Sequence, residues 1–536
     1  MEMAMWPLNK DDHETLRFCS EAARDIERMN AQINRLHSAL TSITLKRDTL
    51  RSKVFALRSS SALQLPTELW QHVFRFCLDV FPVISTSSTN LAPVLLTHVC
   101  RRWRSIALDT PELWSSLHIV IPKPTSFRLA AKCAGIRRAT HAFLERSRDV
   151  PLSISLKARD YSGQTPGECP DEVRQILDCL LPHSKRWKHL KLWMPFSWLT
   201  DVTTYLSSQD LPWLETVLMD DGYPPFLIGA PLLRQLSLEV TGMQTVSSVS
   251  CEEWGKIQVL KLFWRHFELN DLFKILAQST SLRACMVQLL FPSGVDMHPR
   301  METIVMPHLE KLCLTANSAN NLKRILDQLS MANLRQLYIR EHSSLVELNS
   351  SLISSLQGFF HRSSCTILKL EIMIARSSHL PLDELANFFR SLSTLQELVI
   401  VENMHDDPFM DEHLLKAFTV TSPLIDVLCP KLAKIRFSDR FSFTEQTLLD
   451  FVKARTSPSF SSPQVEPGLG DVGADDPSIQ CVTPLDHIFV RTPRPNFVSH
   501  IEKLNLKGVE VVMDSVARFS MISRNTGPSS REIAIP

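Results

Sequence analysis

The stretch ALQLPTELWQHVFRFCLDVF at residues 62–81, followed by LLTHVCRRWRSIALDTPELWSSL at residues 95–117, separates two different parts of the chain. The preceding residues 15–60 repeat apolar side chains at the spacing of one helix face. The residues from 118 to 520 instead repeat short leucine-spaced segments. We therefore predict a mixed α/β chain in which a compact helical region joins a helical arm to a repetitive part.

The compact region at 62–117 has the signals of three short helices. Leu65-Pro66-Thr67 has the form of a helix start, because proline tolerates the first helical position, and Phe81-Pro82 ends that helix. A second helix is predicted over 94–107, with its apolar residues on one face and Arg101, Arg102 and Arg104 on the other. A third short turn follows at 109–114.

These segments resemble the F-box family. The resemblance rests on LPTEL at 65–69, VCRRWRSIA at 99–107 and TPELW at 110–114, which occur in the family's order, whereas the loop at 78–93 is longer than in the shortest form. It implies docking onto a Skp-type adaptor and, through it, a cullin–RING ubiquitin ligase. The adaptor-binding residues implied are Leu65, Pro66, Leu69, Val73, Phe74, Val99, Cys100, Trp103 and Ile106, the last four combining contact with internal packing. A compact helical linker is the alternative.

The arm at 15–60 carries a seven-residue apolar repeat. Its a positions are Ile26, Ile33, Leu40, Arg47 and Val54, and its d positions are Met29, Leu36, Ile43, Leu50 and Leu57. Glycine and proline are absent between Asp11 and Ala62, so one continuous helix is predicted. The pattern is typical of a short coiled coil, with a homodimer through 15–58 as one outcome. A single amphipathic helix folded back on the following domain is the other.

The segment from 118 to 520 repeats the apolar spacing LxxLxL. Between Leu190 and Leu337 the middle leucine-type residues recur every 19 to 27 positions, which is the period of leucine-rich repeats. Proline turns introduce many of these segments, and helical patterns lie between them, for example at 272–276 and 322–329. A further strand is predicted at 151–156 and a last repeat at 501–506. Strand–helix repeats stack into a curved solenoid with a parallel sheet on its concave side.

The residues between the repeat leucines point out of the concave face, because strand side chains alternate between faces. Basic residues exceed acidic ones at these positions. One hypothesis is therefore a surface that receives an acidic or phosphorylated protein segment, and the other is an ordinary solvated strand face. The candidate substrate-binding residues are Lys191, Trp193, Lys261, Lys311, Tyr338, Arg340 and Arg436.

Composition narrows the remaining classes of function. The 536 residues carry 58 basic and 57 acidic side chains, a balance that gives no general argument for nucleic acid or an anionic membrane as partner. The cysteines are scattered without a CxxC pair, which is typical of reduced thiols in the cytoplasm or nucleus and predicts no metal site. The starting residues lack a signal-peptide pattern. Residues 468–473 formally match the dinucleotide-binding spacing GxGxxG, but no strand precedes them, and the chain has no P-loop, HExxH or nucleophile-elbow motif, so we expect neither cofactor nor catalysis.

The sequence thus predicts five parts. They are a disordered N-terminus at 1–14, the arm at 15–60, the F-box at 62–117, an irregular leucine-rich-repeat-like solenoid at 118–520 with a disordered loop at 456–480, and a flexible tail at 521–536. The arrangement resembles a large fungal class of F-box proteins. The function that this resemblance implies is recognition of a target protein for a Skp–cullin–F-box ubiquitin ligase. A scaffold that assembles complexes without ubiquitin transfer is the alternative.

Overall fold

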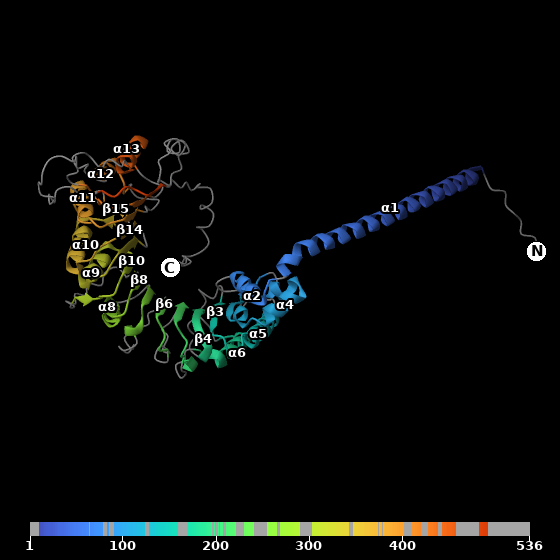
Figure 1. Cartoon of the computed structure of the whole chain (residues 1–536), viewed down its shortest axis with the longest axis horizontal. Coiled ribbons are helices and arrows are strands. Elements are labelled where there is room, and N and C mark those ends of the chain that lie inside the picture. The colour runs from blue at the N-terminus through green and yellow to red at the C-terminus, as the bar shows by residue number, and fades with distance from the viewer. Residues whose placement is uncertain are drawn as a thin grey trace, which may run out of the picture. The chain divides into compact units, whose positions relative to one another are not determined.

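The structure is a computed structural model, shown in Figure 1. The residues it describes are 10–63, 65–78, 83–84, 91–123, 128–158, 169–195, 198, 202, 204–206, 211–220, 230–240, 254–264, 269–289, 303–341, 347–373, 375–377, 379–400, 409–419, 427–437, 442–456 and 482–490. The predictions for 1–9, the loop at 457–480, the repeat at 501–506 and the tail at 521–536 lie outside these residues.

The chain forms two compact units. The first contains residues 1–77 and 96–109, and the second contains 78–95 and 110–536. The helices at the start of the chain are α1 (Lys10–Leu63), α2 (Thr67–Phe76), α3 (Val94–Val99) and α4 (Arg101–Leu108). The predicted helical arm is therefore present as one helix of 54 residues. None of the described helices combines the length and the apolarity needed to cross a membrane.

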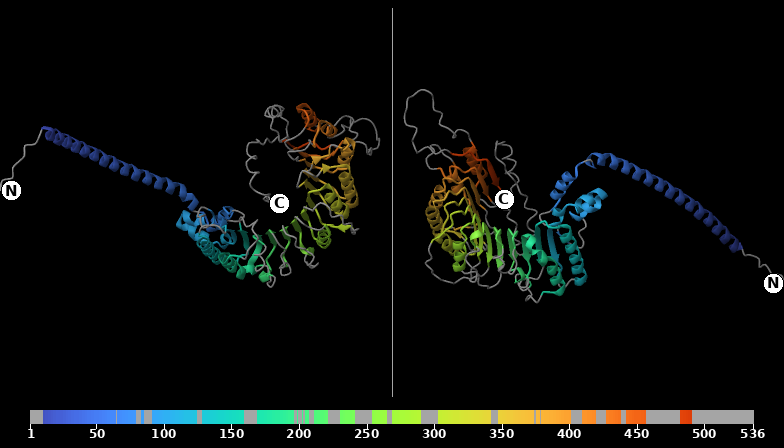
Figure 2. Two further views of the ribbon diagram at one scale, coloured as in Figure 1. Left: turned by 180° about the vertical axis from the view of Figure 1, so that it is seen from behind. Right: turned by 60° about the horizontal axis from the view of Figure 1, so that its bottom comes forward.

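The second unit contains a large parallel sheet, as the sequence predicts. Fourteen described strands lie side by side in chain order, which Figure 2 shows as one continuous sheet. They are β1 (Val83–Ile84), β2 (Ser116–Ile121), β3 (Leu152–Ala158), β4 (Trp187–Trp193), β5 (Thr216–Asp220), β6 (Gln235–Val240), β7 (Val259–Trp264), β8 (Ala284–Leu289), β10 (Lys311–Ala316), β12 (Gln336–Glu341), β14 (Lys369–Met373), β16 (Glu397–Ile400), β17 (Lys434–Phe437) and β18 (His487–Val490). Two short parallel pairs accompany it, β9 (Ile304–Val305) with β11 (Leu329–Ser330) and β13 (Glu347–Leu348) with β15 (Ala375–Arg376).

Helices connect many of these strands and lie along one face of the sheet (Figure 1). They are α5 (Leu129–Arg146), α6 (Asp171–Leu180), α8 (Leu269–Gln278), α9 (Ala319–Gln328), α10 (Ser350–Ser363), α11 (Leu382–Arg390), α12 (Glu412–Phe418) and α13 (Glu445–Thr456). A short 3₁₀ turn at Pro111–Trp114 precedes β2. We call the opposite face of the sheet, away from the helices, the inner face.

The repeat leucines form the core between the sheet and these helices. Leu312 on β10 is in register with Leu337 on β12, and both side chains are buried. Aromatic rings also pack between neighbouring helices. The ring centres of Phe360 on α10 and Phe388 on α11 lie 6.2 Å apart. Because each strand contributes the same two inward apolar positions, neighbouring strands must align in one register. This alignment places the residues between the leucines in rows across the inner face.

The sequence patterns missed several features of the described fold, among them the short strand β1 and the pairs β9 with β11 and β13 with β15. The strand β18 at 487–490 was not predicted, although Leu485, Ile488 and Val490 follow the same LxxLxL spacing as the other repeats. The helix predicted over 94–107 is wrong, because the chain is extended at Cys100, with φ −157° and ψ 170°, and divides it into α3 and α4. The single apolar face expected for that helix is therefore split between two helix directions.

Candidate functional site

Helix α2 packs on α4 through one of its two apolar faces. Trp70 and Phe74 are buried, and their rings lie 4.8 and 5.0 Å from the ring of Trp103 on α4. Tilted and edge-to-face aromatic pairs at this distance add about 0.5–1.5 kcal/mol beyond the burial of their area. These three rings therefore hold α2 against α4.

The second apolar face of α2 is exposed. Leu69, Val73 and Phe76 are 50%, 43% and 79% exposed, and their spacing places them on one side of the helix. We call these three residues the α2 outer face. Val99 at the end of α3 is also exposed, at 51%. Contiguous exposed apolar side chains on a small helical unit are typical of a protein-binding surface.

The Leu65-Pro66 hook precedes α2. Pro66 is exposed and occupies the N-cap position, next to the first helical residue Thr67. The guanidinium of Arg102 on α4 donates a hydrogen bond from Nη2 to the Leu65 carbonyl oxygen, with a distance of 2.8 Å. This bond fixes the backbone of the hook against α4, although 37 residues separate the two partners in the chain.

Cys100 caps α4. Its Sγ accepts a hydrogen bond from the Trp103 backbone N–H at 3.4 Å, which satisfies one of the free amides at the helix start. The Arg104 Nε donates to the Thr97 carbonyl oxygen at 2.7 Å and so ties α4 to the preceding helix. A capping role explains why the chain turns at Cys100 instead of continuing as one helix.

The residues predicted to bind the adaptor thus fall into three groups. Pro66, Leu69, Val73 and Val99 are exposed, and Leu65, Cys100 and Trp103 are half-buried. Phe74 and Ile106 are buried, at 0% and 5% exposure, so the structure assigns them to packing and not to a contact surface. Phe76 was missed as a surface candidate, although its spacing from Leu69 and Val73 could have revealed it.

A second candidate surface lies on the inner face of the sheet, around Tyr338. Lys311 on β10, Arg340 on β12 and Lys369 on β14 place their cationic groups 5.2, 5.7 and 5.8 Å from the centre of the Tyr338 ring. The parallel register of β10, β12 and β14 brings the three cations together. Cations this close to an aromatic face are attracted to its π electrons. We call these four residues the Tyr338 cluster.

Two of the three cations are paired with carboxylates. Arg340 Nη2 lies 2.6 Å from Glu371 Oε1, and Lys369 Nζ lies 2.5 Å from Glu397 Oε1. Among the described residues, Lys311 makes no such ion pair. Its ammonium group instead lies over the ring of Tyr338. Lys311 therefore remains the cation of the cluster that an added anion can neutralise.

Burial and charge shift the pKa values in the cluster. Burial, the nearby carboxylates of Glu371 and Glu397 and the Cys313 thiol raise the pKa of Tyr338 to about 12. Burial and the neighbouring ammonium of Lys369 lower the pKa of Lys311. The phenol of Tyr338 thus stays protonated at neutral pH, and it donates a hydrogen bond to Gln336 Oε1 at 3.0 Å.

The other predicted substrate-binding residues lie elsewhere on the same sheet. Trp193 on β4 has the ammonium groups of Lys157 and Lys191 at 4.9 and 5.9 Å from its ring. Arg436 on β17 lies 4.3 Å from the Phe489 ring on β18. Lys261 lies on β7, between Trp193 and the Tyr338 cluster in strand order, whereas Arg436 lies beyond the cluster. The predicted set is therefore one sheet face with separate cation–aromatic groups, and not one compact site.

Sequence reasoning missed several residues of this surface. They are Lys157, Lys369, Glu371 and Phe489. Lys369 and Glu371 occupy the same positions between the repeat apolar residues as the predicted set, so the same rule applied to 367–372 would have found both. The ion pair between Arg340 and Glu371, which joins two neighbouring strands, could not be predicted from the spacing of residues along the chain.

Comparison with known proteins adds one finding. Residues 62–120 match the F-box-like family model, so the chain contains an F-box-like domain at that position. The match includes the Leu65-Pro66 hook, α2, α3, α4 and all of strand β2 except its last residue. A search of curated proteins found no match to the chain. F-box domains are generally non-catalytic adaptors and typically bind Skp-type proteins.

Proposed function

We propose that this chain is the substrate-recognition subunit of a Skp–cullin–F-box ubiquitin ligase. The observation that carries the proposal is the F-box-like match at 62–120 together with the exposed apolar α2 outer face within it. A ligase subunit of this kind raises the local concentration of target lysines near the catalytic module of the complex. It does not itself perform chemistry.

The adaptor would bind the hook and the α2 outer face. Leu69, Val73 and Phe76 supply apolar contact area, and Val99 extends it on α3. Burying one such side chain completely contributes about 1.5–3 kcal/mol. The Trp70, Phe74 and Trp103 rings would act indirectly, because they set the position of α2 on α4.

Affinity for a purified Skp-type adaptor tests this proposal. The double variant Leu69→Ala/Phe76→Ala of the full chain should bind the adaptor at least about tenfold more weakly, since each truncation removes an exposed apolar anchor. Glu68→Gln/Arg75→Gln on the same helix is the matched control and should bind as the unaltered chain does. A chain that binds no adaptor in any form would favour the scaffold alternative.

The inner face would receive the target protein. The order of parallel strands and connecting helices supports a leucine-rich-repeat-like solenoid, in which the face without helices is the usual binding surface. The two lysines around Trp193 and Arg436 beside Phe489 combine positive charge with aromatic area, and Lys311 adds positive charge beside Tyr338, whose side chain is buried. This chemistry fits an acidic or phosphorylated segment of a protein, because charge-assisted hydrogen bonds to lysine and arginine are strong.

Charge reversal tests target recognition separately from adaptor binding. A peptide array containing phosphorylated, acidic and neutral sequences should show preference for the first two, and Lys261→Glu/Lys311→Glu/Arg436→Glu should lose that preference. Arg340 is left unchanged because its loss would unpair Glu371. Lys132→Glu/Arg138→Glu, two exposed positions on the helix α5, is the control. Equal binding by the reversed variant would refute this part while leaving the adaptor proposal standing.

A further inference from the structure

Helix α1 exposes the apolar stripe that the sequence predicts. Each apolar residue at an a or d position between Ile26 and Val54 is at least 49% exposed. They are Ile26, Met29, Ile33, Leu36, Leu40, Ile43, Leu50 and Val54. A stripe of this length with alternating spacings of three and four needs a second helix to cover it. Leu45, which lies off the stripe, is equally exposed and serves below as a reference.

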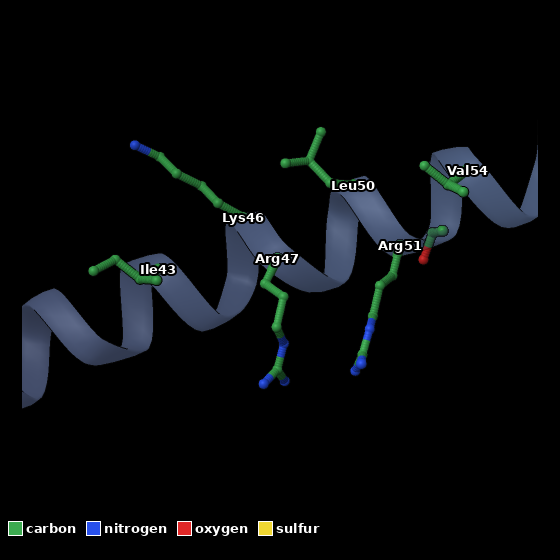
Figure 3. Close-up of a pocket in the computed structure, with 7 residues that line it drawn as sticks. Ile43, Lys46, Arg47, Leu50, Arg51 and Val54 are labelled. Carbon is green, nitrogen blue, oxygen red and sulfur yellow. The ribbon is translucent and has the colours of Figure 1, made fainter.

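Charged residues flank the stripe on its C-terminal half. Figure 3 shows Lys46 projecting from one side of α1 and Arg47 and Arg51 from the other, next to Ile43, Leu50 and Val54. Arg47 itself occupies an a position of the repeat. The positive charges of this segment decide whether a second helix can pair with α1 in a parallel or an antiparallel orientation without repulsion.

A parallel second copy in register would place like charges together. Arg47 would face Arg47 of the other copy at the core, and Lys46 at g would lie beside Arg51 at e of the other copy, twice by symmetry. Like charges at these flanking positions are destabilising. A parallel homodimer is thus disfavoured in the half of the helix that carries Ile43, Leu50 and Val54.

An antiparallel second copy removes these conflicts. Pairing a positions with d positions about a centre at Ser38 sets Ile33 opposite Ile43 and Leu36 opposite Leu40. The same alignment sets Ile26 opposite Leu50. Arg47 then faces Met29, and its long aliphatic stem can cover this residue while the guanidinium reaches water.

The same register also brings opposite charges together. Asp25 and Lys53 both occupy g positions, and the antiparallel pair sets Asp25 of each copy beside Lys53 of the other. The other flanking pairs are Gln32 with Lys46, Ala39 with Ala39, Ala23 with Arg51, Asn30 with Thr44 and His37 with His37, and none of them sets two acidic or two Lys/Arg side chains together. Charge complementarity therefore selects a second copy of α1 in antiparallel orientation as the occupant of the stripe.

We propose that the chain forms an antiparallel homodimer through residues 22–54 of α1. One consequence concerns spacing. The C-terminal ends of the two α1 helices at Leu63 would lie roughly 75 Å apart, because each residue of a helix advances 1.5 Å. The two F-box-like domains would then begin at opposite ends of the pair. This inference goes beyond the proposed ligase function and does not depend on it.

Disulfide trapping tests orientation and register. Ile33→Cys and Ile43→Cys are made separately in full chains that also carry Cys19→Ser and Cys77→Ser, which removes the two exposed native thiols among the described cysteines. Under mild oxidation, the mixed chains should form a disulfide-linked dimer above the level of the parent chain, and neither variant alone should do so. Efficient linkage of each variant with itself would indicate a parallel pair and overturn the proposal.

Sedimentation tests the dimer itself. The molar mass of the unaltered chain, measured by sedimentation equilibrium, should be twice the 61.0 kDa of one chain. Leu36→Glu should weaken the dimer at least tenfold, whereas Leu45→Glu should change it less than twofold, although the two leucines are 71% and 70% exposed. A monomeric unaltered chain at micromolar concentration, or equal effects of both variants, would overturn the proposal.

A charge exchange completes the test. Lys53→Asp should weaken the dimer, and Asp25→Lys/Lys53→Asp should restore it, because the exchanged pair attracts again only in the proposed register. Failure of the double variant to recover would refute this register. If the chain is monomeric and α1 binds a different protein, then a helix of that protein covers the stripe and the proposal is wrong.

Discussion

Arg340 on β12 donates two hydrogen bonds to one carboxylate oxygen of Glu371 on β14, from Nε at 3.0 Å and from Nη2 at 2.6 Å. Both side chains are largely buried, at 24% and 14% exposure. Partial burial strengthens such a pair relative to one in water. One of the arginines predicted to bind an acidic target is therefore already engaged within the sheet.

This pair should be coupled in stability. In a double-mutant cycle, Arg340→Met and Glu371→Gln should each lower the free energy of unfolding, and the two effects should be non-additive by about 1–2 kcal/mol. Denaturant unfolding monitored by circular dichroism provides the measurement. The cycle Lys274→Met/Asp271→Asn is the comparison, because that lysine is 57% exposed, and its coupling should be smaller. Additive effects at Arg340 and Glu371 would contradict the prediction.

Arg102 should influence adaptor binding without belonging to the outer face of α2. Its guanidinium holds the Leu65 carbonyl, so Arg102→Met should loosen the hook and weaken adaptor binding by about three- to tenfold. Arg101→Met is the control on the same helix, because Arg101 is exposed. Titration calorimetry with the purified adaptor checks both. Equal affinities of the two variants would show that the hook does not need this anchor.

Arg455 should be essential for the stability of the C-terminal strands. It is buried, and its guanidinium donates to the carbonyl oxygens of Phe418, Leu428 and Cys429. Burial lowers its pKa to about 10, so it remains charged at neutral pH. Arg455→Met leaves these acceptors without their donor and should lower the free energy of unfolding by about 2–4 kcal/mol.

Thermal unfolding of the Arg455 variant measures this effect. Lys453→Met is the matched substitution, since Lys453 is exposed on the same helix, and it should shift the melting temperature much less. A melting temperature unchanged in the Arg455 variant would mean that the three carbonyls find other donors.

His183 and His189 should make the protein less stable in mild acid. Burial is the main cause that lowers the pKa of each, assisted at His183 by Arg186 and at His189 by Lys188. The unfolded chain then takes up protons at a higher pH than the folded chain, so stability falls as pH drops through the ordinary histidine range. Replacing both by Gln should reduce the loss of melting temperature between pH 7.5 and pH 5.5. An unchanged loss would assign it to other groups.

The local sequence patterns were sufficient to predict most helices and strands as such, but not where each one ends or what it packs against. Leu312 and Leu337 predicted strands, and the structure aligns them, because apolar spacing along a strand is a property of the chain itself. The split of the helix at Cys100 was not predictable in this way. Its apolar spacing continues from Leu96 to Ile106 and gives no sign of the extended backbone at Cys100, whose Sγ caps the start of α4.

The sequence by itself determined the long helix, the F-box-like segment and the parallel sheet, because short-range spacing and local motifs encode them. Only the tertiary structure decided which apolar side chains remain exposed. Phe74 turns toward Trp103 while Leu69, one of its neighbours on α2, faces outward. It also decided which charges stay available, since Glu371 reaches Arg340 only when distant strands lie side by side, and this pairing depends on the packing of the whole sheet.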